Sequence, residues 1–174
     1  GQPYSDPRII GSTDPQLLGD DSATAYNEVR EALLATAASN AAQTAVFNAL
    51  PTGAVPTDLG NAQGFIGASA NLRALGFLDP VADPVKESIF GDPPSIGFNS
   101  AFTYDFDPSD GIAPNALDFE AAAVHEIGHA LGFDSWMGFK ELDETLPVTT
   151  MPWDLFRFRP GGLVLSSLNN RARV

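Results

Sequence analysis

Cysteine is absent from this chain of 174 residues, and histidine occurs only twice. Without cysteine there is no disulfide framework, no thiolate nucleophile and no thiolate metal site, so a bound metal must be held by His, Asp or Glu. Basic residues are also scarce, since 9 Lys and Arg stand against 22 Asp and Glu and give a net charge of −13. This charge repels nucleic-acid phosphates and anionic lipid surfaces, and we expect neither as a partner.

Long apolar runs are missing too, and no stretch approaches the roughly 20 residues that a membrane-spanning helix needs. The length suits one domain over residues 1–174. Strong acidity with only two lysines, Lys86 and Lys140, suits a secreted protein in a calcium-containing medium, and equally suits plain solubility. Residue 1 is not Met and no charged, apolar leader follows it, so we expect a mature or trimmed form. Nothing in the composition indicates the oligomeric state.

A long amphipathic helix is expected over residues 22–50, with Asp21 or Ser22 as its cap. Its apolar positions recur at helical spacing, so we expect it to back a sheet and to carry no chemistry. Residues 1–20 are rich in Pro, Gly and Asp and are expected to be largely irregular, as are the turn-rich residues 79–94.

Apolar and polar residues alternate from Ser95 to Tyr104, which predicts a half-buried strand. Two prolines precede it and polar residues interrupt it, which favours an edge strand. The alternative is a strand inside the sheet.

An acidic turn follows this strand and places Asp105, Asp107 and Asp110 within six residues. Three carboxylates beside a proline and Gly111 offer oxygen ligands for calcium, although the spacing matches no EF-hand loop. The alternative is a solvated turn held by hydrogen bonds of its own Asp side chains.

The strongest chemical signal is His125-Glu126-Ile127-Gly128-His129, on a helix expected near 117–131 and stopped by Gly132. Residues four apart lie one turn above each other, so both imidazoles can reach one metal ion. Glu126 is rotated by about 100° from His125, and its carboxylate can reach a water near the metal. The pattern predicts a zinc site with Glu126 as the general base; the alternative is a pair of ordinary histidines on a helix face.

On the same helix Val124, Ile127 and Leu131 follow the i, i+3, i+7 rule and are expected to lie in the core. Gly128 costs about 1 kcal/mol relative to alanine inside a helix. Its presence suggests that a neighbouring element passes close by.

The segment His125-Glu126-x-x-His129-x-x-Gly132 resembles the active-site helix of the metzincin zinc endopeptidases. That resemblance implies an α+β domain with a mixed twisted sheet, a backing helix and the active-site helix. It also implies that the strand near Phe98, Asn99 and Ser100 binds an extended peptide substrate. Metzincins place a third zinc ligand at the position of Ser135, which is a poor zinc ligand.

More of the chain is similar to a group of bacterial secreted metalloproteases that share Ile96-Gly97-Phe98-Asn99-Ser100, Asp105-Phe106-Asp107-Pro108 and the segment Asp154-Leu155-Phe156-Arg157. In that group Asp154 recurs where a third ligand is needed, so the resemblance makes Asp154 the candidate. Capping of a turn, or pairing with Arg157, is the alternative role for Asp154. Asp134, Glu141 and Asp143 are the reserve ligands.

These observations together predict a secreted zinc-dependent endopeptidase that cleaves protein or peptide substrates. The metal would acidify its bound water and polarise the scissile carbonyl, while Glu126 would move the proton to the leaving amine. Arg157 and Arg159 could help to stabilise the developing negative charge, or could be surface charges. The competing hypothesis is a catalytically inactive secreted binding module that retains the metzincin-like helix, because the usual third ligand position holds Ser135.

Overall fold

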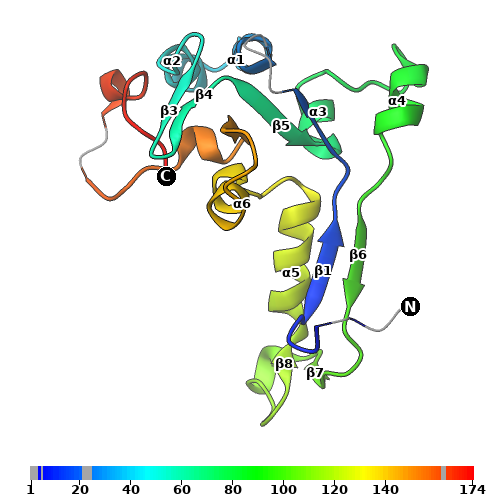
Figure 1. Ribbon diagram of the computed structural model, residues 1–174. Coiled ribbons are helices and arrows are strands. Elements are labelled where there is room, and N and C mark those ends of the chain that lie inside the picture. Colours follow the sequence, from blue (N-terminus) through cyan, green and yellow to red (C-terminus); the bar gives the residue numbers. More distant parts are fainter. Residues whose placement is uncertain (1–3, 5, 21–24, 162–163) are drawn as a thin grey trace.

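The computed structural model describes residues 4, 6–20, 25–161 and 164–174. Over these residues the chain is a mixed α+β fold with six α-helices and small sheets (Figure 1). The helices are α1 (Ala25–Thr36), α2 (Ala41–Asn48), α3 (Ser69–Ala74), α4 (Pro84–Phe90), α5 (Phe119–Ala130) and α6 (Trp136–Leu142). None of them is long and apolar enough to cross a membrane.

The strands are short and pair in small groups. They are β1 (Gly11–Asp14), β2 (Leu17–Asp20), β3 (Val55–Thr57), β4 (Gly60–Ala62), β5 (Gly64–Ala68), β6 (Ser95–Phe98), β7 (Tyr104–Asp105), β8 (Leu117–Asp118) and β9 (Thr149–Thr150). The strand β5 lies between β2, which is antiparallel to it, and β9, which is parallel. Separate pairs are formed by β1 with β6, β3 with β4 and β7 with β8.

The main core lies where α1 packs against β5, so the expected backing helix is confirmed. Tyr26 and Val29 of α1 are buried against Phe65 of β5, together with Leu50 and Leu155. The Tyr26 hydroxyl donates a 2.9 Å hydrogen bond to the carbonyl of Pro51, which satisfies its polar end inside the core. Burying these large side chains contributes about 1.5–3 kcal/mol for each one.

The single helix expected over 22–50 is in fact two helices, α1 and α2. The chain turns at residues 37–40 because Asn40 caps α2, and its side-chain oxygen accepts from the N–H groups of Ala42 and Gln43 at 3.1 Å. An Asn side chain competes for backbone hydrogen bonds and favours a cap over a helix interior. The proposed caps Asp21 and Ser22 lie outside the described residues.

The expectation of an irregular lead-in was also wrong, because β1 and β2 lie within residues 1–20. The strand β1 pairs antiparallel with β6, with Gly11 opposite Phe98 and Asp14 opposite Ser95. The predicted strand over 95–104 is shorter than expected and ends as β6 at Phe98. Within the turn-rich residues 79–94, Asp83 caps the unexpected helix α4.

The helix α5 packs along the ribbon formed by β1 and β6 and away from the main core (Figure 1). Its predicted ends are confirmed. Asp118 caps the start by accepting from the N–H of Ala121 at 3.0 Å, and Gly132 ends the helix with a φ of +83°. The N–H of Phe133 then bonds the carbonyl of Gly128 at 2.9 Å, which closes the turn at the C-terminus of the helix.

The predicted buried face of α5 was wrong. Val124, Ile127 and Leu131 are 63%, 49% and 59% exposed, whereas Glu126 and Ala130 are 6% and 8% exposed. The β1–β6 ribbon covers the face that carries Glu126, and the described residues leave the apolar stripe on the outside.

Among the residues that the structure describes, the expected close neighbour of Gly128 does not occur. A Cβ atom built at this position would meet nothing nearer than the Cβ of Phe133 at 3.7 Å, which is an ordinary contact. Gly132 differs, because a Cβ there would lie 1.9 Å from the side-chain oxygen of Asn71.

Candidate metal centre

His125 and His129 point their rings at one another from successive turns of α5. Their Nε2 atoms are 3.0 Å apart, and the rings are nearly perpendicular, with an interplanar angle of 88°. His125 is exposed and His129 is partly buried. The i, i+4 spacing therefore brings two imidazole nitrogens to one point, as the sequence predicted.

Glu126 is buried between α5 and β1. The hydroxyl of Thr13 lies 2.7 Å from its Oε2 atom and 2.9 Å from its backbone carbonyl, and its single proton serves one or both of these acceptors. Gly11 passes so close that a Cβ atom there would lie 2.8 Å from Oε1 of Glu126. Strand β1 thus holds this carboxylate with the Thr13 hydroxyl, and Gly11 leaves room for it because glycine has no Cβ atom.

These groups share one hollow of about 380 Å³. Its walls come from β1 and the residues after it, from α5, and from Asp134 and Phe139, which lie after α5 and in α6. The lining residues are Gly11, Ser12, Thr13, Pro15, Leu17, His125, Glu126, His129, Asp134 and Phe139. A hollow of this size that contains both histidines and the buried glutamate is large enough for a few residues of a peptide.

Asp134 is the reserve ligand that the structure brings to this site. Its Oδ1 atom lies 2.6 Å from Nδ1 of His129, on the side of the ring away from His125, and its side chain is 12% exposed. The other two reserve ligands, Glu141 and Asp143, are exposed and do not line the hollow. Hydrogen bonds from the hydroxyl and N–H of Thr145 hold the pKa of Asp143 below its usual range.

The chemistry of this donor set fits zinc, because imidazole nitrogens and carboxylates are its usual ligands in a cysteine-free protein. Two Nε2 atoms 3.0 Å apart can bind one ion with small side-chain movements. No group of three His, Asp or Glu side chains arranged to hold a metal occurs among the residues that the structure describes. The described geometry therefore supplies two protein ligands.

Asp154, the candidate third ligand, is fully buried and occupied elsewhere. Its Oδ1 atom accepts from the Ser135 hydroxyl at 2.6 Å, and its Oδ2 atom accepts from the N–H groups of Trp136 and Met151, each at 2.9 Å. Ser135 also caps α6 by accepting from the N–H of Gly138. The structure thus gives Ser135 and Asp154 a joint structural role, and it does not bring Asp154 into the hollow with the histidines.

The two arginines considered for charge stabilisation also lie outside the hollow. Arg157 donates to the Ser135 hydroxyl and lies 3.9 Å from Asp154. Arg159 forms an exposed ion pair with Asp58 at 2.7 Å. These contacts match the alternative roles: Arg157 pairs with Asp154, and Arg159 is a surface charge.

The residues expected to bind substrate do not line the hollow either. Asn99 is buried, its N–H donates to the carbonyl of Ile10 at 2.8 Å, and its side-chain amide donates to the carbonyl of Ile9 at 2.9 Å. Phe98 packs against Phe119 with ring centroids 4.9 Å apart, while Ser100 is exposed in the following turn. It is β1 that borders the histidines.

The acidic turn uses its carboxylates internally. Asp105 accepts from the N–H groups of Asp107 and Ala113 at 3.0 and 2.7 Å. Hydrogen bonds from the hydroxyl and N–H of Ser109 hold the pKa of Asp107 below its usual range. Asp110 is exposed. These contacts match the alternative of a turn held by its own Asp side chains, and Gly111 provides the bend with a φ of +96°.

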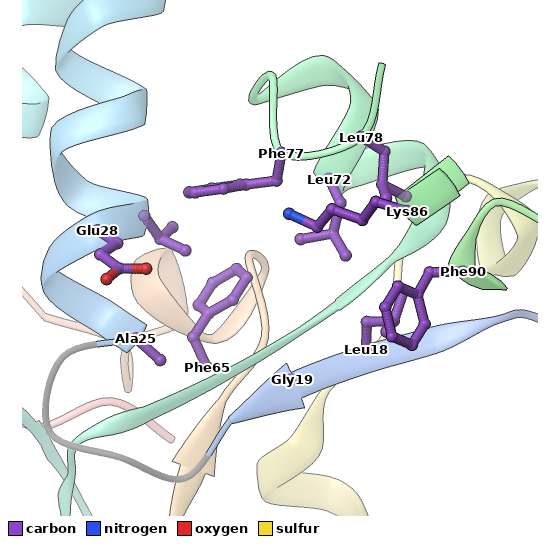
Figure 2. A pocket seen from close by; sticks show the side chains of 11 residues that line it. Leu18, Gly19, Ala25, Glu28, Phe65, Leu72, Phe77, Leu78, Lys86 and Phe90 are labelled. Carbon is purple, nitrogen blue, oxygen red and sulfur yellow. The ribbon is translucent and has the colours of Figure 1, made fainter. Parts of the chain in front are cut away.

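A second hollow of about 420 Å³ lies between α1, α4 and β5 (Figure 2). Its walls are mainly apolar, with Phe65, Leu72 and Phe77 among them, and the ionisable residues among the described lining are Glu28 and Lys86. It contains neither histidine nor a group of metal-ligand side chains. Although this hollow is larger, the candidate chemistry lies in the one beside α5.

Two residues that contact the glutamate escaped the sequence analysis. Thr13 and Gly11 are more than 100 positions away from Glu126, in a segment whose Pro, Gly and Asp content predicted irregular structure. Residues 11–14, Gly-Ser-Thr-Asp, include no large apolar side chain, so the alternation that predicts a strand is absent there.

Comparison of this chain with protein-family models, with curated proteins and with solved structures finds no match in any of the three.

Proposed function

We propose that this chain is a secreted zinc-dependent endopeptidase with a metzincin-like active-site helix. The observation that carries the proposal is the convergence of the His125 and His129 Nε2 atoms in a hollow that also contains the carboxylate of Glu126. A zinc peptidase needs metal ligands and an adjacent general base, and this hollow offers two imidazoles and a glutamate on one helix.

His125 and His129 are the proposed zinc ligands. When bound, zinc would acidify a water molecule and polarise the scissile carbonyl. Glu126 is the proposed general base, and its carboxylate would take a proton from the attacking water and pass it to the leaving amine. Thr13 holds the carboxylate of Glu126 in one position, so that less motion must be lost when the substrate is bound.

An extended peptide is the proposed substrate, and strand β1 is the proposed docking edge. The hydrogen bond from Asn99 N–H to the Ile10 carbonyl shows that Ile10 faces β6. In an antiparallel pair the backbone groups alternate between the two edges, so those of Gly11 and Thr13 are directed away from β6. A peptide can add to this second edge beside the histidines.

A catalytically inactive secreted binding module is the second candidate. It is favoured by the contacts of Ser135 and Asp154, which leave two protein ligands at the histidines where a catalytic zinc site commonly has three. The presence of Glu126 in the hollow favours the peptidase, because a binding module has no need for a buried carboxylate there.

Casein or gelatin cleavage by the purified chain separates the two candidates. We expect cleavage that a chelator abolishes and that zinc restores. Glu126→Gln should keep zinc and lower cleavage at least about 100-fold, the usual contribution of a general base. Glu141→Gln is the matched control, since it changes an exposed Glu outside the hollow. Zinc binding without cleavage in the unmodified chain favours the binding module, and equal cleavage by the Glu126→Gln variant contradicts the mechanism.

A further inference from the structure

The ring of His129 is held between two different partners. Its Nε2 atom faces Nε2 of His125 at 3.0 Å, and its Nδ1 atom lies 2.6 Å from Oδ1 of Asp134. The two atoms are close, but they do not have hydrogen-bond geometry, so the contact is electrostatic. Both partners are side chains that line the same hollow.

The turn after α5 brings Asp134 to this position. Gly132 adopts a positive φ, and the N–H of Phe133 returns to the carbonyl of Gly128. Asn71 holds the turn from outside by donating from its side-chain amide to the carbonyl of Leu131 at 3.0 Å. As a result the chain doubles back, and Asp134, five residues after His129, reaches the outer nitrogen of that ring.

We propose that Asp134 is a positioning residue that fixes the tautomer of His129, with the proton on Nδ1 and the lone pair on Nε2. A lone pair on Nδ1 would face the lone pairs of a carboxylate oxygen 2.6 Å away and be repelled, so this nitrogen favours carrying the proton. The free Nε2 lone pair of His129 then points toward His125. Metal-bound histidines commonly have a carboxylate on the second ring nitrogen, and this carboxylate orients the ring and raises its basicity.

The tautomer of His125 follows from that of His129. The two Nε2 atoms are 3.0 Å apart, which is a hydrogen-bond distance. Because Nε2 of His129 is the acceptor, Nε2 of His125 must carry the proton. The two neutral histidines therefore have opposite tautomers, Nδ1–H for His129 and Nε2–H for His125.

This role excludes Asp134 as a direct ligand in the same arrangement. Its carboxylate lies on the Nδ1 side of the ring, whereas a metal shared with His125 lies on the Nε2 side. Only the statement about metal affinity rests on the proposed function, because the tautomers belong to the metal-free protein.

Nuclear magnetic resonance of the metal-free full chain, labelled with ¹⁵N-histidine, tests the tautomers directly. The chain has only two histidines, so long-range ¹H–¹⁵N spectra contain four ring nitrogens. At pH about 8.5 we expect a protonated Nδ1 in His129 and a protonated Nε2 in His125. A proton on Nε2 of His129 in the unmodified chain overturns the proposal, and this measurement needs no variant to fold.

The variant Asp134→Ala removes the carboxylate, and Asp143→Ala is the control because Asp143 is exposed and lies outside the hollow. We expect His129 to lose its preference for Nδ1–H in the first variant and to keep it in the second. Retention of a fully protonated Nδ1 in Asp134→Ala contradicts the role of the carboxylate.

Zinc affinity, measured by competition with a chromophoric chelator, distinguishes positioning from ligation. We expect Asp134→Ala to weaken zinc binding about 10- to 100-fold, the usual effect of removing an outer carboxylate, and Asp143→Ala to leave it unchanged. A loss above about 1,000-fold identifies Asp134 as a ligand and overturns the positioning role. If the unmodified chain binds no zinc, the proposed function is wrong. The tautomers are still decided separately, by the ¹H–¹⁵N spectra.

Discussion

Replacement of Thr13 by valine removes the hydroxyl that holds Glu126 and keeps the shape of the side chain. The hydroxyl lies 2.7 Å from Oε2 of Glu126, and that glutamate is 6% exposed, so water cannot easily replace the lost donor. Leaving a buried acceptor without its donor costs about 1–3 kcal/mol. With about 2 kcal/mol, and about 2–4 °C of Tm for each kcal/mol at this chain length, we expect Tm to fall by about 4–8 °C.

A double-mutant cycle with Glu126→Ala measures how much of this loss belongs to the contact. The Thr13 hydroxyl also faces the backbone carbonyl of Glu126, which remains in every variant. The cycle therefore measures the free energy of the contact between the hydroxyl and the Glu126 carboxylate alone. We expect a coupling free energy of about 1 kcal/mol or more from urea unfolding, since residues in direct contact couple by about 0.5–3 kcal/mol. If the chain has the proposed peptidase activity, Thr13→Val should lower kcat about 10-fold with little change in KM.

Thr145→Val provides the matched control, because the Thr145 hydroxyl bonds the carboxylate of Asp143 at 2.6 Å on the exposed surface. We expect it to change stability by less than about 0.5 kcal/mol, as surface substitutions commonly do. Additive effects of Thr13→Val and Glu126→Ala, or equal effects of the two threonine substitutions, would refute the role of β1 in holding the glutamate.

Three further results follow from the packing and burial. Gly128→Ala should raise the unfolding free energy by up to about 1 kcal/mol, because a Cβ atom has room there, whereas Gly132→Ala should lower it by about 1–3 kcal/mol, because Gly132 has a positive φ and a Cβ atom there would clash with Asn71. Thermal melts that shift in the same direction for both variants would contradict this contrast. Burial raises the pKa of Tyr26 to about 12, above its value near 10 in the unfolded chain, so the unfolded state loses the phenol proton first and the unfolding free energy should fall between pH about 10 and 12. An unfolding free energy that stays constant over this pH range would contradict the prediction. Asp154→Asn should lower the unfolding free energy by about 3 kcal/mol in urea and leave the zinc affinity within about threefold of that of the unmodified chain. A large fall in zinc affinity without a fall in stability would instead support Asp154 as the third ligand.

The helix α5 could be predicted because its signals are local. Asp118 provides a cap, Gly132 provides a stop, and two histidines at i and i+4 must share one side of a helix. All three depend only on residues within one or two turns. The pairing of His125 with His129 was therefore visible in the sequence.

The neighbours of that helix could not be predicted, because they come from distant parts of the chain. Helical periodicity identifies an apolar stripe at Val124, Ile127 and Leu131, but it does not tell which face the rest of the chain covers. The β1–β6 ribbon covers the face of Glu126 instead. Thr13 is 113 positions from the glutamate that it contacts, so no local pattern could reveal the pair.

The full set of contacts that Asp154 makes could not be predicted from its residue type. A carboxylate is a suitable zinc ligand, and the sequence offered no other use for it beyond a cap or a pair with Arg157. In the structure it accepts hydrogen bonds from Ser135, Trp136 and Met151 and so joins the start of α6 to the C-terminal region. That geometry depends on two backbone N–H groups, which a sequence does not display.

Metal-edge diffraction from crystals grown with zinc tests the central claim most directly, since anomalous scattering locates the ion without assumptions about activity. We expect one strong peak within about 2.0–2.1 Å of the Nε2 atoms of both His125 and His129, next to the carboxylate of Glu126. No peak at this pair of histidines, or a zinc ion bound only elsewhere on the chain, would contradict the account.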